Sequence, residues 1–214
     1  MKTFLKKVSV KIILCAGLFS GLCLLSVQAL AVVEARLTYG LNATKMDLAQ
    51  FYTGSTASVP SVTPLYGVGG EILFNIPMMG WGLGLRYENL GLKASSNSLE
   101  FNSTLTRTAA VGYYRLIDTV LFLGPIASIG LSHKGELKVK ENSVDLSSFS
   151  STSASSTSIG LEAGVRLVGL VVGMEAGYLS CKFSGVSDSG VAALGSKDLD
   201  MSGTYAKVFV GFSM

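Results

Sequence analysis

The stretch that decides the fold runs from Ile159 to Leu179 and reads IGLEAGVRL, then VGLV, then VGMEAGYL. In its first arm, apolar residues at every second position alternate with glycine, glutamate and arginine. The second arm repeats this alternation from Val172 to Tyr178. A period of two places alternate side chains on opposite faces of a β-strand. Because only a few residues around Gly169 join the arms, the pattern predicts an antiparallel hairpin.

The two faces of this hairpin differ in character. The apolar face is continuous, so either a protein core or lipid must cover it. The other face is built from glycine and isolated charges of both signs, which suits a crowded, enclosed space. If the turn consists of Val168 and Gly169, Glu162 lies opposite Glu175, and like charges opposed in this way destabilise a sheet. We therefore expect a cation beside the two glutamates, and Arg166 is the nearby candidate.

The composition is unusual for a soluble domain. A chain of 214 residues fits one domain or at most two. It is 49% hydrophobic and 14% charged, whereas soluble domains average about 25% charged residues. The formal charge of +3 includes Lys2, Lys6, Lys7 and Lys11, and without them 13 basic residues (17 − 4) face 14 acidic ones. This near-neutral balance does not indicate a nucleic-acid partner.

Residues 1–31 have the layout of a secretory signal peptide. A basic start precedes an apolar run from Ile12 to Leu25, and small residues follow, ending in Ala29-Leu30-Ala31. The apolar run is shorter than the roughly 20 residues that a membrane-spanning helix needs. We therefore expect cleavage after Ala31 and a mature chain of residues 32–214, in which Cys181 is the one cysteine and acts as a packed small residue.

Alternation with a period of two recurs through the chain and predicts six further strands. They lie at about residues 35–41, 66–74, 81–88, 101–114, 120–132 and 204–214. Long polar loops are expected at 44–64, after Glu88, at 133–156 and at 183–200, and short turns lie between them. Only helices and closed barrels satisfy all backbone polar groups in lipid. The pattern therefore predicts an all-β, eight-stranded antiparallel transmembrane up-and-down β-barrel over residues 32–214.

Two residues interrupt this pattern. Arg107 falls on the apolar side of the fourth strand, where it would have to extend toward the outer interface. Pro125 cannot donate to a hydrogen-bond ladder, so we expect a bulge or distortion in the fifth strand.

Two sets of residues are the candidate sites. Inward charges, four of each sign, are expected to form salt bridges that fill a lumen too narrow for a channel; paired catalytic carboxylates are the other interpretation. Outward aromatic residues are expected to form girdles at both membrane interfaces. The charges are Arg36, Glu71, Arg86, Glu88, Glu162, Arg166, Glu175 and Lys207. The girdles are Phe74, Trp81, Tyr113 and Phe212 near the short turns, and Tyr66, Tyr87 and Tyr178 near the long loops.

With its export signal, its strand pattern and its Phe-Ser-Met end, the chain resembles the small eight-stranded outer-membrane barrels of Gram-negative bacteria, the OmpA, OmpX and OmpW group. The resemblance covers about Val32 to Met214. It implies location in the outer membrane, contact with its lipid and lipopolysaccharide, and recognition of the last strand by the barrel-assembly machinery. Members of the group usually end on an aromatic residue, whereas Phe212 lies two places before Met214 here.

The sequence offers little catalytic chemistry. His133 has Ser132 and Glu136 nearby, and some barrels of this kind are lipid A deacylases that use such residues. The three lack the sequence context of that family and lie at a loop edge, so we expect a plain loop histidine and a protein that is not an enzyme. No metal-ligand spacing is present, and no helix follows the glycines to make a phosphate loop. We expect neither a metal nor a cofactor.

Three functions remain open from sequence alone. The first, which we favour, is a structural or surface-interaction role through serine-rich external loops, with an unidentified extracellular partner. The second is a porin-like narrow channel for small, hydrophobic molecules, which the OmpW resemblance implies. The third is a secreted, lipocalin-like barrel that holds an apolar ligand, which would reverse the two faces of every strand.

Overall fold

The computed structural model describes residues 32–44, 62–65, 67–76, 79–96, 99–141, 144–167, 169–188 and 197–214. The predicted signal peptide and Tyr66 lie outside these residues. The strands are β1 (Val32–Thr44), β2 (Val62–Leu65), β3 (Gly67–Asn75), β4 (Trp81–Ser96), β5 (Leu99–Tyr114), β6 (Ile117–Asp118), β7 (Leu121–Glu141), β8 (Val144–Ser151), β9 (Ala154–Leu167), β10 (Leu170–Asp188), β11 (Lys197–Asp200) and β12 (Gly203–Ser213).

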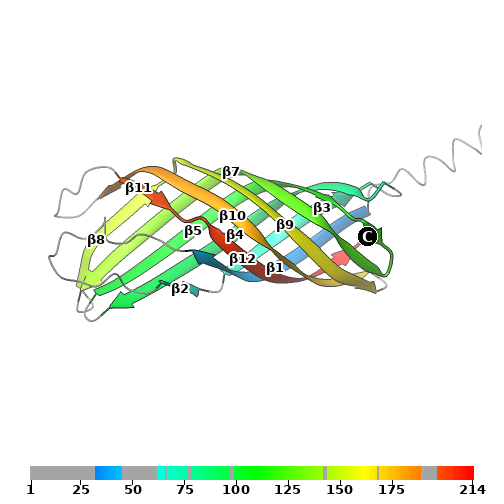
Figure 1. Ribbon diagram of the computed structural model, residues 1–214, viewed down its shortest axis with the longest axis horizontal. Coiled ribbons are helices and arrows are strands. Elements are labelled where there is room, and N and C mark those ends of the chain that lie inside the picture. The colour runs from blue at the N-terminus through cyan, green and yellow to red at the C-terminus, as the bar shows by residue number, and fades with distance from the viewer. Residues whose placement is uncertain are drawn as a thin grey trace, which may run out of the picture.

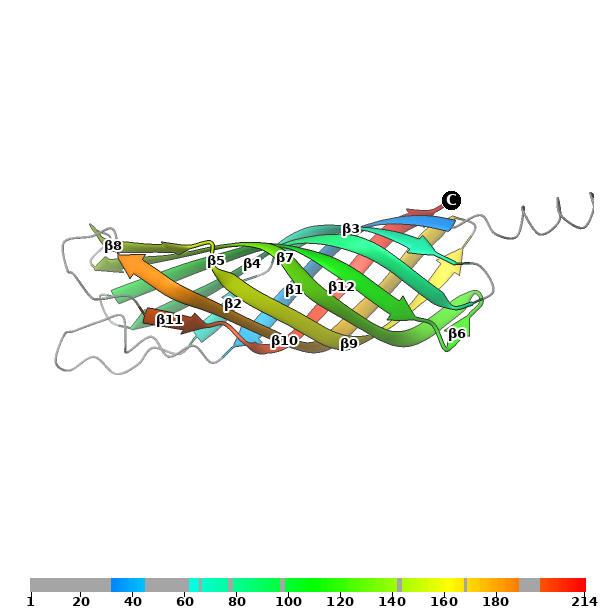
Figure 2. The same cartoon turned by 90° about the horizontal axis from the view of Figure 1, so that it is seen from above.

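Eight of the described strands close into an antiparallel barrel, which confirms the predicted fold class. Around the ring they follow the order β1, β3, β4, β5, β7, β9, β10 and β12, and β12 pairs with β1 to close it. Figures 1 and 2 show a long barrel with strands inclined to its axis. The described chain begins and ends at the same rim, where Val33 N donates to Met214 O at 3.0 Å. We call this rim the turn end and the opposite rim the distal end.

The predicted hairpin has the predicted register. Leu167 pairs with Leu170, and Glu162 pairs with Glu175. Gly169, in the connection, has φ of +86°, a left-handed conformation that glycine adopts without steric cost. The turn that was read from the sequence therefore sets which side chains of β9 and β10 face inward.

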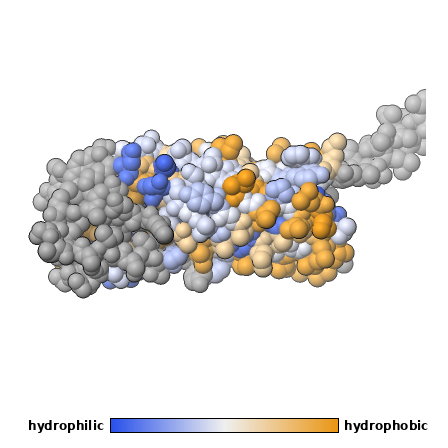
Figure 3. All heavy atoms as spheres, in the orientation of Figure 1, coloured by the Kyte–Doolittle hydropathy of each residue, from blue (hydrophilic) through white to orange (hydrophobic). Residues whose placement is uncertain are grey.

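A belt of apolar side chains surrounds the half of the barrel near the turn end. Leu83 and Leu161 are more than half exposed, and Figure 3 shows hydrophobic residues gathered over this half. On β9 the belt runs along Ile159–Leu167 and on β10 along Leu170–Tyr178, close to the roughly 9–11 residues of a transmembrane β-strand. The charges of these strands face inward, which is opposite to a soluble lipocalin-like barrel.

We expect Leu161→Arg to lower the free energy of unfolding by about 2–4 kcal/mol, because the change places a charge in the middle of the lipid-facing belt. Ser150→Arg is the matched control, since Ser150 is exposed on β8. Folded yields in lipid vesicles measure the difference, and equal yields for the two variants would contradict the belt.

Beyond the belt, the prediction of long loops was wrong for most of the described residues. Much of 133–156, of 183–200 and of the segment after Glu88 is strand. Here the faces are reversed: Lys93, Lys138 and Lys182 point outward, while the interior is apolar. We call this part the distal section. Its core is Leu92, Ala94, Phe101, Leu105, Leu137, Val139, Phe149, Leu179, Cys181, Phe183, Leu199, Met201 and Tyr205. The outer wall of this section carries charged side chains, so its strands bury their apolar side chains inside.

The face assignment of β5 was also wrong. Arg107 and Tyr113 are 1% and 2% exposed and lie in the lumen, with Leu105, Ala109 and Val111. Arg107 therefore does not extend to the interface, and Tyr113 does not belong to a girdle. The outward face carries Thr106, Thr108, Ala110 and Gly112, small side chains that offer little contrast in hydrophobicity with the inward set.

A β-bulge lies in β7 opposite this part of β5. Thr108 pairs with Ser132 and Ala109 with Gly130, so Leu131 is the extra residue. The bulge switches the inward positions of β7 from even numbers to odd numbers, which turns His133 into the lumen. Pro125 shows a smaller effect than expected. The pairing of β7 with β9 is regular through Pro125. On the other edge of β7, the ladder with β5 ends at Ile126 and the ladder with β6 begins at Leu123, so Pro125 lies between the two ladders.

Candidate functional site

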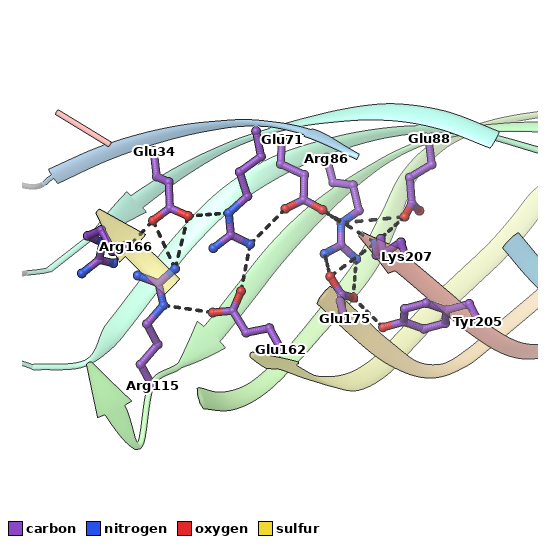
Figure 4. Close-up of polar contacts among 11 residues, drawn as sticks. Glu34, Glu71, Arg86, Glu88, Arg115, Glu162, Arg166, Glu175, Tyr205 and Lys207 are labelled. Carbon is purple, nitrogen blue, oxygen red and sulfur yellow. Dashed lines mark hydrogen bonds and ion pairs between the residues drawn. The ribbon is translucent and has the colours of Figure 1, made fainter. Parts of the chain in front are cut away.

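The lumen inside the belt holds a column of buried charges (Figure 4). Among the described residues five glutamates and five cations are buried: Glu34, Glu71, Glu88, Glu162 and Glu175, with Arg36, Arg86, Arg107, Arg115 and Lys207. All the charges singled out from the sequence except Arg166 lie in this set. The column is electrically balanced, which is the condition for tolerating charges away from water.

The part of the column nearer the turn end is centred on Glu162. Its carboxylate accepts hydrogen bonds from Arg36 Nη1 at 2.8 Å and Arg115 Nε at 3.0 Å. Glu34 joins both arginines, with Arg115 Nη2 at 3.2 Å. The Arg36 guanidinium also lies 4.1 Å from the centre of the Phe209 ring, and that of Arg115 lies 4.4 Å from the centre of the Phe122 ring. Aromatic faces stabilise the cations where water is excluded.

The part of the column nearer the distal end is centred on Arg86. Its guanidinium donates to Glu71 Oε1 at 2.7 Å and to Glu175 Oε2 at 2.6 Å. Glu175 also accepts a hydrogen bond from the Tyr205 hydroxyl at 2.6 Å. Lys207 Nζ lies 2.7 Å from Glu88 Oε1, and Arg107 Nε lies 2.6 Å from Glu88 Oε2. Arg86, on β4, therefore connects carboxylates of β3 and β10.

The opposed glutamates of the hairpin are separated by these partners. Glu162 accepts hydrogen bonds from Arg36 and Arg115, while Glu175 accepts hydrogen bonds from Arg86. The expectation that Arg166 neutralises them was wrong. Arg166 lies at the turn end with its side chain 23% exposed, and it pairs with Asp118 at 3.0 Å and with Glu34 at 3.5 Å rather than with either glutamate of the hairpin.

A further group of polar side chains in the lumen lies around His133. Its Nε2 lies 2.7 Å from Ser156 Oγ, and Arg107 donates to Ser128 Oγ at 2.5 Å. The prediction of a loop histidine was wrong, because His133 is buried in the lumen. Ser132 is exposed, and Glu136 pairs with Lys138 on the outer wall, so these two do not converge with His133. The charged group beside the His133–Ser156 pair is a cation, Arg107, at 3.4 Å from Ser156, whereas a hydrolytic triad needs a group that orients the base.

Sequence reasoning missed Glu34, Arg107, Arg115 and Tyr205 as members of the lumen network. Glu34 lies two residues before Arg36 on the same face of β1, so the alternation could have indicated it. Arg107 lies on the odd-numbered face of β5, and Arg115 directly follows the strand in the same alternation. This face points inward, whereas prediction from the sequence took it as the outward one. Tyr205 lies two places before Lys207, on the same inward face of the last strand.

The aromatic residues lie at two levels of the wall. Phe74, Trp81 and Phe212 face outward near the turn end, and Tyr87 and Tyr178 face outward near the start of the distal section. Tyr39, which was not assigned to a girdle, also faces outward.

Within the described ranges, no three His, Cys, Asp or Glu side chains are grouped so as to hold a metal ion. In the same residues no helix has the length and apolarity to cross a membrane.

No protein-family model matches the chain, and no curated protein matches it. Among solved structures, Ail of Yersinia pestis, in complex with the heparin analogue sucrose octasulfate, aligns with a TM-score of 0.50 and 12% identity over 86% of this chain and 99% of that one. OprG of Pseudomonas aeruginosa gives a TM-score of 0.47 and 12% identity over 87% and 97%. The Escherichia coli outer-membrane protease OmpT gives 0.44 and 8% over 86% and 93%. The chain has the fold of the bacterial outer-membrane β-barrels, as the resemblance implied.

Proposed function

We propose that this chain is an outer-membrane β-barrel without a steady ion current, whose distal section is a surface for interaction outside the cell. The observation that carries the proposal is that the lumen is filled at two successive levels by different chemistry. The charge column fills the belt, and the apolar core fills the distal section. An ion would have to cross both, so the interior supports a structural role rather than the narrow channel.

The outer wall of the distal section supports the interaction role. It carries ion pairs such as Lys140 with Asp145 at 3.1 Å, together with many serine and threonine hydroxyls. A hollow of about 360 Å³ between β7, β8 and β10 is lined by Lys134, Ser150, Ser151, Thr152, Ser153, Ser184 and Gly185. Hydroxyls and a lysine suit a polar partner. The strands would hold this surface away from the membrane, in place of the long polar loops predicted from the sequence.

Two further partners follow from the location. Lys93 and Lys182 lie on the outer wall beyond Tyr87 and Tyr178, at a height where cations meet the anionic groups of lipopolysaccharide. The last strand, with Phe212 exposed on the belt, is the segment that we propose the barrel-assembly machinery recognises. The absence of an enzymatic activity also stays a proposal, supported by the separation of Ser132 and Glu136 from His133.

Cysteine labelling on intact cells tests the orientation. Ser150→Cys, on the distal section, should react with a membrane-impermeant maleimide, whereas Leu116→Cys at the turn end should react only after the outer membrane is permeabilised. Cys181 is an internal control, because it is buried and burial raises the pKa of its thiol to about 11, while the thiolate is the reactive form. The reverse labelling pattern would contradict the proposal.

A further inference from the structure

His133 lies where the charge column meets the apolar core of the distal section. Its side chain is buried, while its neighbours Ser132 and Lys134 are exposed on the outer wall. These polar neighbours place His133 beyond the lipid-facing belt, whose last large apolar residue on β7 is Leu131. On one side the ring hydrogen-bonds to a serine of the polar network, and on the other it meets Phe183 of the core edge-on. The residue therefore joins the two kinds of filling in the lumen.

The hydrogen bonds around the ring favour a neutral imidazole. Ser156 Oγ lies 2.7 Å from His133 Nε2 and also accepts a hydrogen bond from Arg107 Nη1 at 3.4 Å. A serine hydroxyl has one proton to donate, and a guanidinium only donates. The hydroxyl is therefore satisfied when it donates its proton to Nε2, which can accept it only in the neutral ring.

The nearby charges of the lumen also oppose a proton on the ring. Arg107, on β5, pairs with His133 across the ladder and is a buried cation. The carboxylate bound to Arg107 is Glu88, at 2.6 Å, and Glu88 also pairs with Lys207 at 2.7 Å. The described contacts of the His133 ring include no carboxylate. An imidazolium here would therefore be a second cation beside Arg107 without an anion of its own.

The strands packed against the ring do not supply that anion. From β9 comes the Ser156 hydroxyl, and β10 contributes the inward residues Cys181 and Phe183. The charges of β10 and β11 at this level, Lys182 and Asp200, are exposed on the outer wall and pair with each other at 3.8 Å. Burial, and after it Arg107, lower the pKa of His133, in agreement with this arrangement.

Close packing prevents the ring from moving to water within the closed barrel. A Cβ on Gly130 would lie 2.2 Å from His133 Nε2 and 2.3 Å from Ser156 Oγ, so both groups lie directly against the backbone of β7. On the other side, a Cβ on Gly135 would lie 2.6 Å from the Phe183 ring. Because a buried charge without a partner is strongly unfavourable, a protonated ring is accommodated only if this packing opens.

We propose that His133 is an acid-sensitive joint, at which a proton loosens the distal section while the belt stays folded. The closed state holds the ring neutral and the open state takes up the proton. The stability of the distal section is therefore complete above the ordinary histidine pKa of about 6.5 and falls as the pH drops below it. The joint goes beyond the proposed surface role, because it determines at which pH that surface is formed.

Cys181 can report the opening, because it pairs with Ser156 across the ladder and is 0% exposed. The experiment measures its reaction with 2,2′-dipyridyl disulfide, which also labels thiols at acid pH, in residues 32–214 refolded in lipid vesicles. His133→Gln, which keeps a polar side chain but does not titrate, is the reference. Between pH 8 and pH 5, the wild-type rate relative to that of His133→Gln should rise about fivefold or more, with a ceiling of about thirtyfold from linkage. An unchanged ratio would overturn the proposal.

Two measurements on the wild type need no variant. His133 is the one histidine of the chain, so its ring protons can be followed by NMR in detergent micelles, and they should titrate below pH 6.5. A midpoint at or above the ordinary value of about 6.5 would overturn the proposal. Trp81, the one tryptophan, is exposed on the belt, and its fluorescence in vesicles should not change between pH 8 and pH 5. A red shift that accompanies Cys181 labelling would mean that the whole barrel opens, which also contradicts the joint.

Discussion

Replacing Arg86 by methionine is expected to lower the free energy of unfolding by about 3–5 kcal/mol, because it leaves buried carboxylates without their cation. Arg86 is 1% exposed and contacts Glu71 and Glu175 at 2.7 and 2.6 Å. Methionine keeps most of the volume, so the lost charge dominates the effect. Urea unfolding of the barrel in lipid vesicles, followed by the gel mobility of the folded form, measures the change.

Arg166→Met is the matched control for this prediction. Arg166 is partly exposed and pairs with Asp118 at 3.0 Å and, more loosely, with Glu34 of the column at 3.5 Å. Because accessible ion pairs contribute about 0–1 kcal/mol, its loss should cost much less than that of Arg86. Adding Glu175→Gln to Arg86→Met should recover part of the lost stability, because it removes one of the unpaired charges. If Arg86→Met and Arg166→Met were equally stable, the buried column would not be a stabilising network.

Phe183→Ala should destabilise the protein by about 3–5 kcal/mol, the usual cost of removing a buried phenylalanine ring. Phe183 is 0% exposed in the apolar core of the distal section, and the His133 ring meets it edge-on with 6.4 Å between ring centres. The neighbouring Lys182 points outward, so Lys182→Ala should change stability by no more than about 0.5 kcal/mol.

Chemical unfolding of the two variants gives the comparison. Phe183→Ala is expected to be less stable than Lys182→Ala only if the distal section has a packed core like that of a soluble barrel. A Phe183→Ala protein as stable as Lys182→Ala would mean that this part of the chain behaves as the solvated loop predicted from the sequence.

The strands of the barrel could be predicted from the sequence where the two faces of a strand differ strongly in hydrophobicity. In β9 and β10, large apolar side chains alternate with glycine and charge, so the strands, the turn at Gly169 and the register of Glu162 with Glu175 could all be predicted. The same contrast places Arg36 and Glu71 in the lumen. The partners of these charges could not be predicted, because they come from strands that are distant in sequence.

Where the contrast is weak or reversed, prediction from the sequence was wrong. On β5 the lipid-facing side carries threonine, alanine and glycine, while the lumen takes Val111 and Tyr113, so hydrophobicity pointed to the wrong face. In the distal section the alternation persists, since Leu137 and Val139 alternate with Glu136, Lys138 and Lys140. The polar residues nevertheless made the segment resemble a loop. The position of His133 depends on the bulge at Leu131, and no local residue pattern indicates this bulge.

The central claim is that the lumen is closed by a balanced charge column and an apolar core. Electrical recording from the refolded protein in a planar bilayer tests it most directly. We predict no steady conductance above that of the bare membrane, because neither level leaves a continuous aqueous path. Large, stable, ion-selective openings from the wild-type protein would contradict the claim and favour the narrow channel.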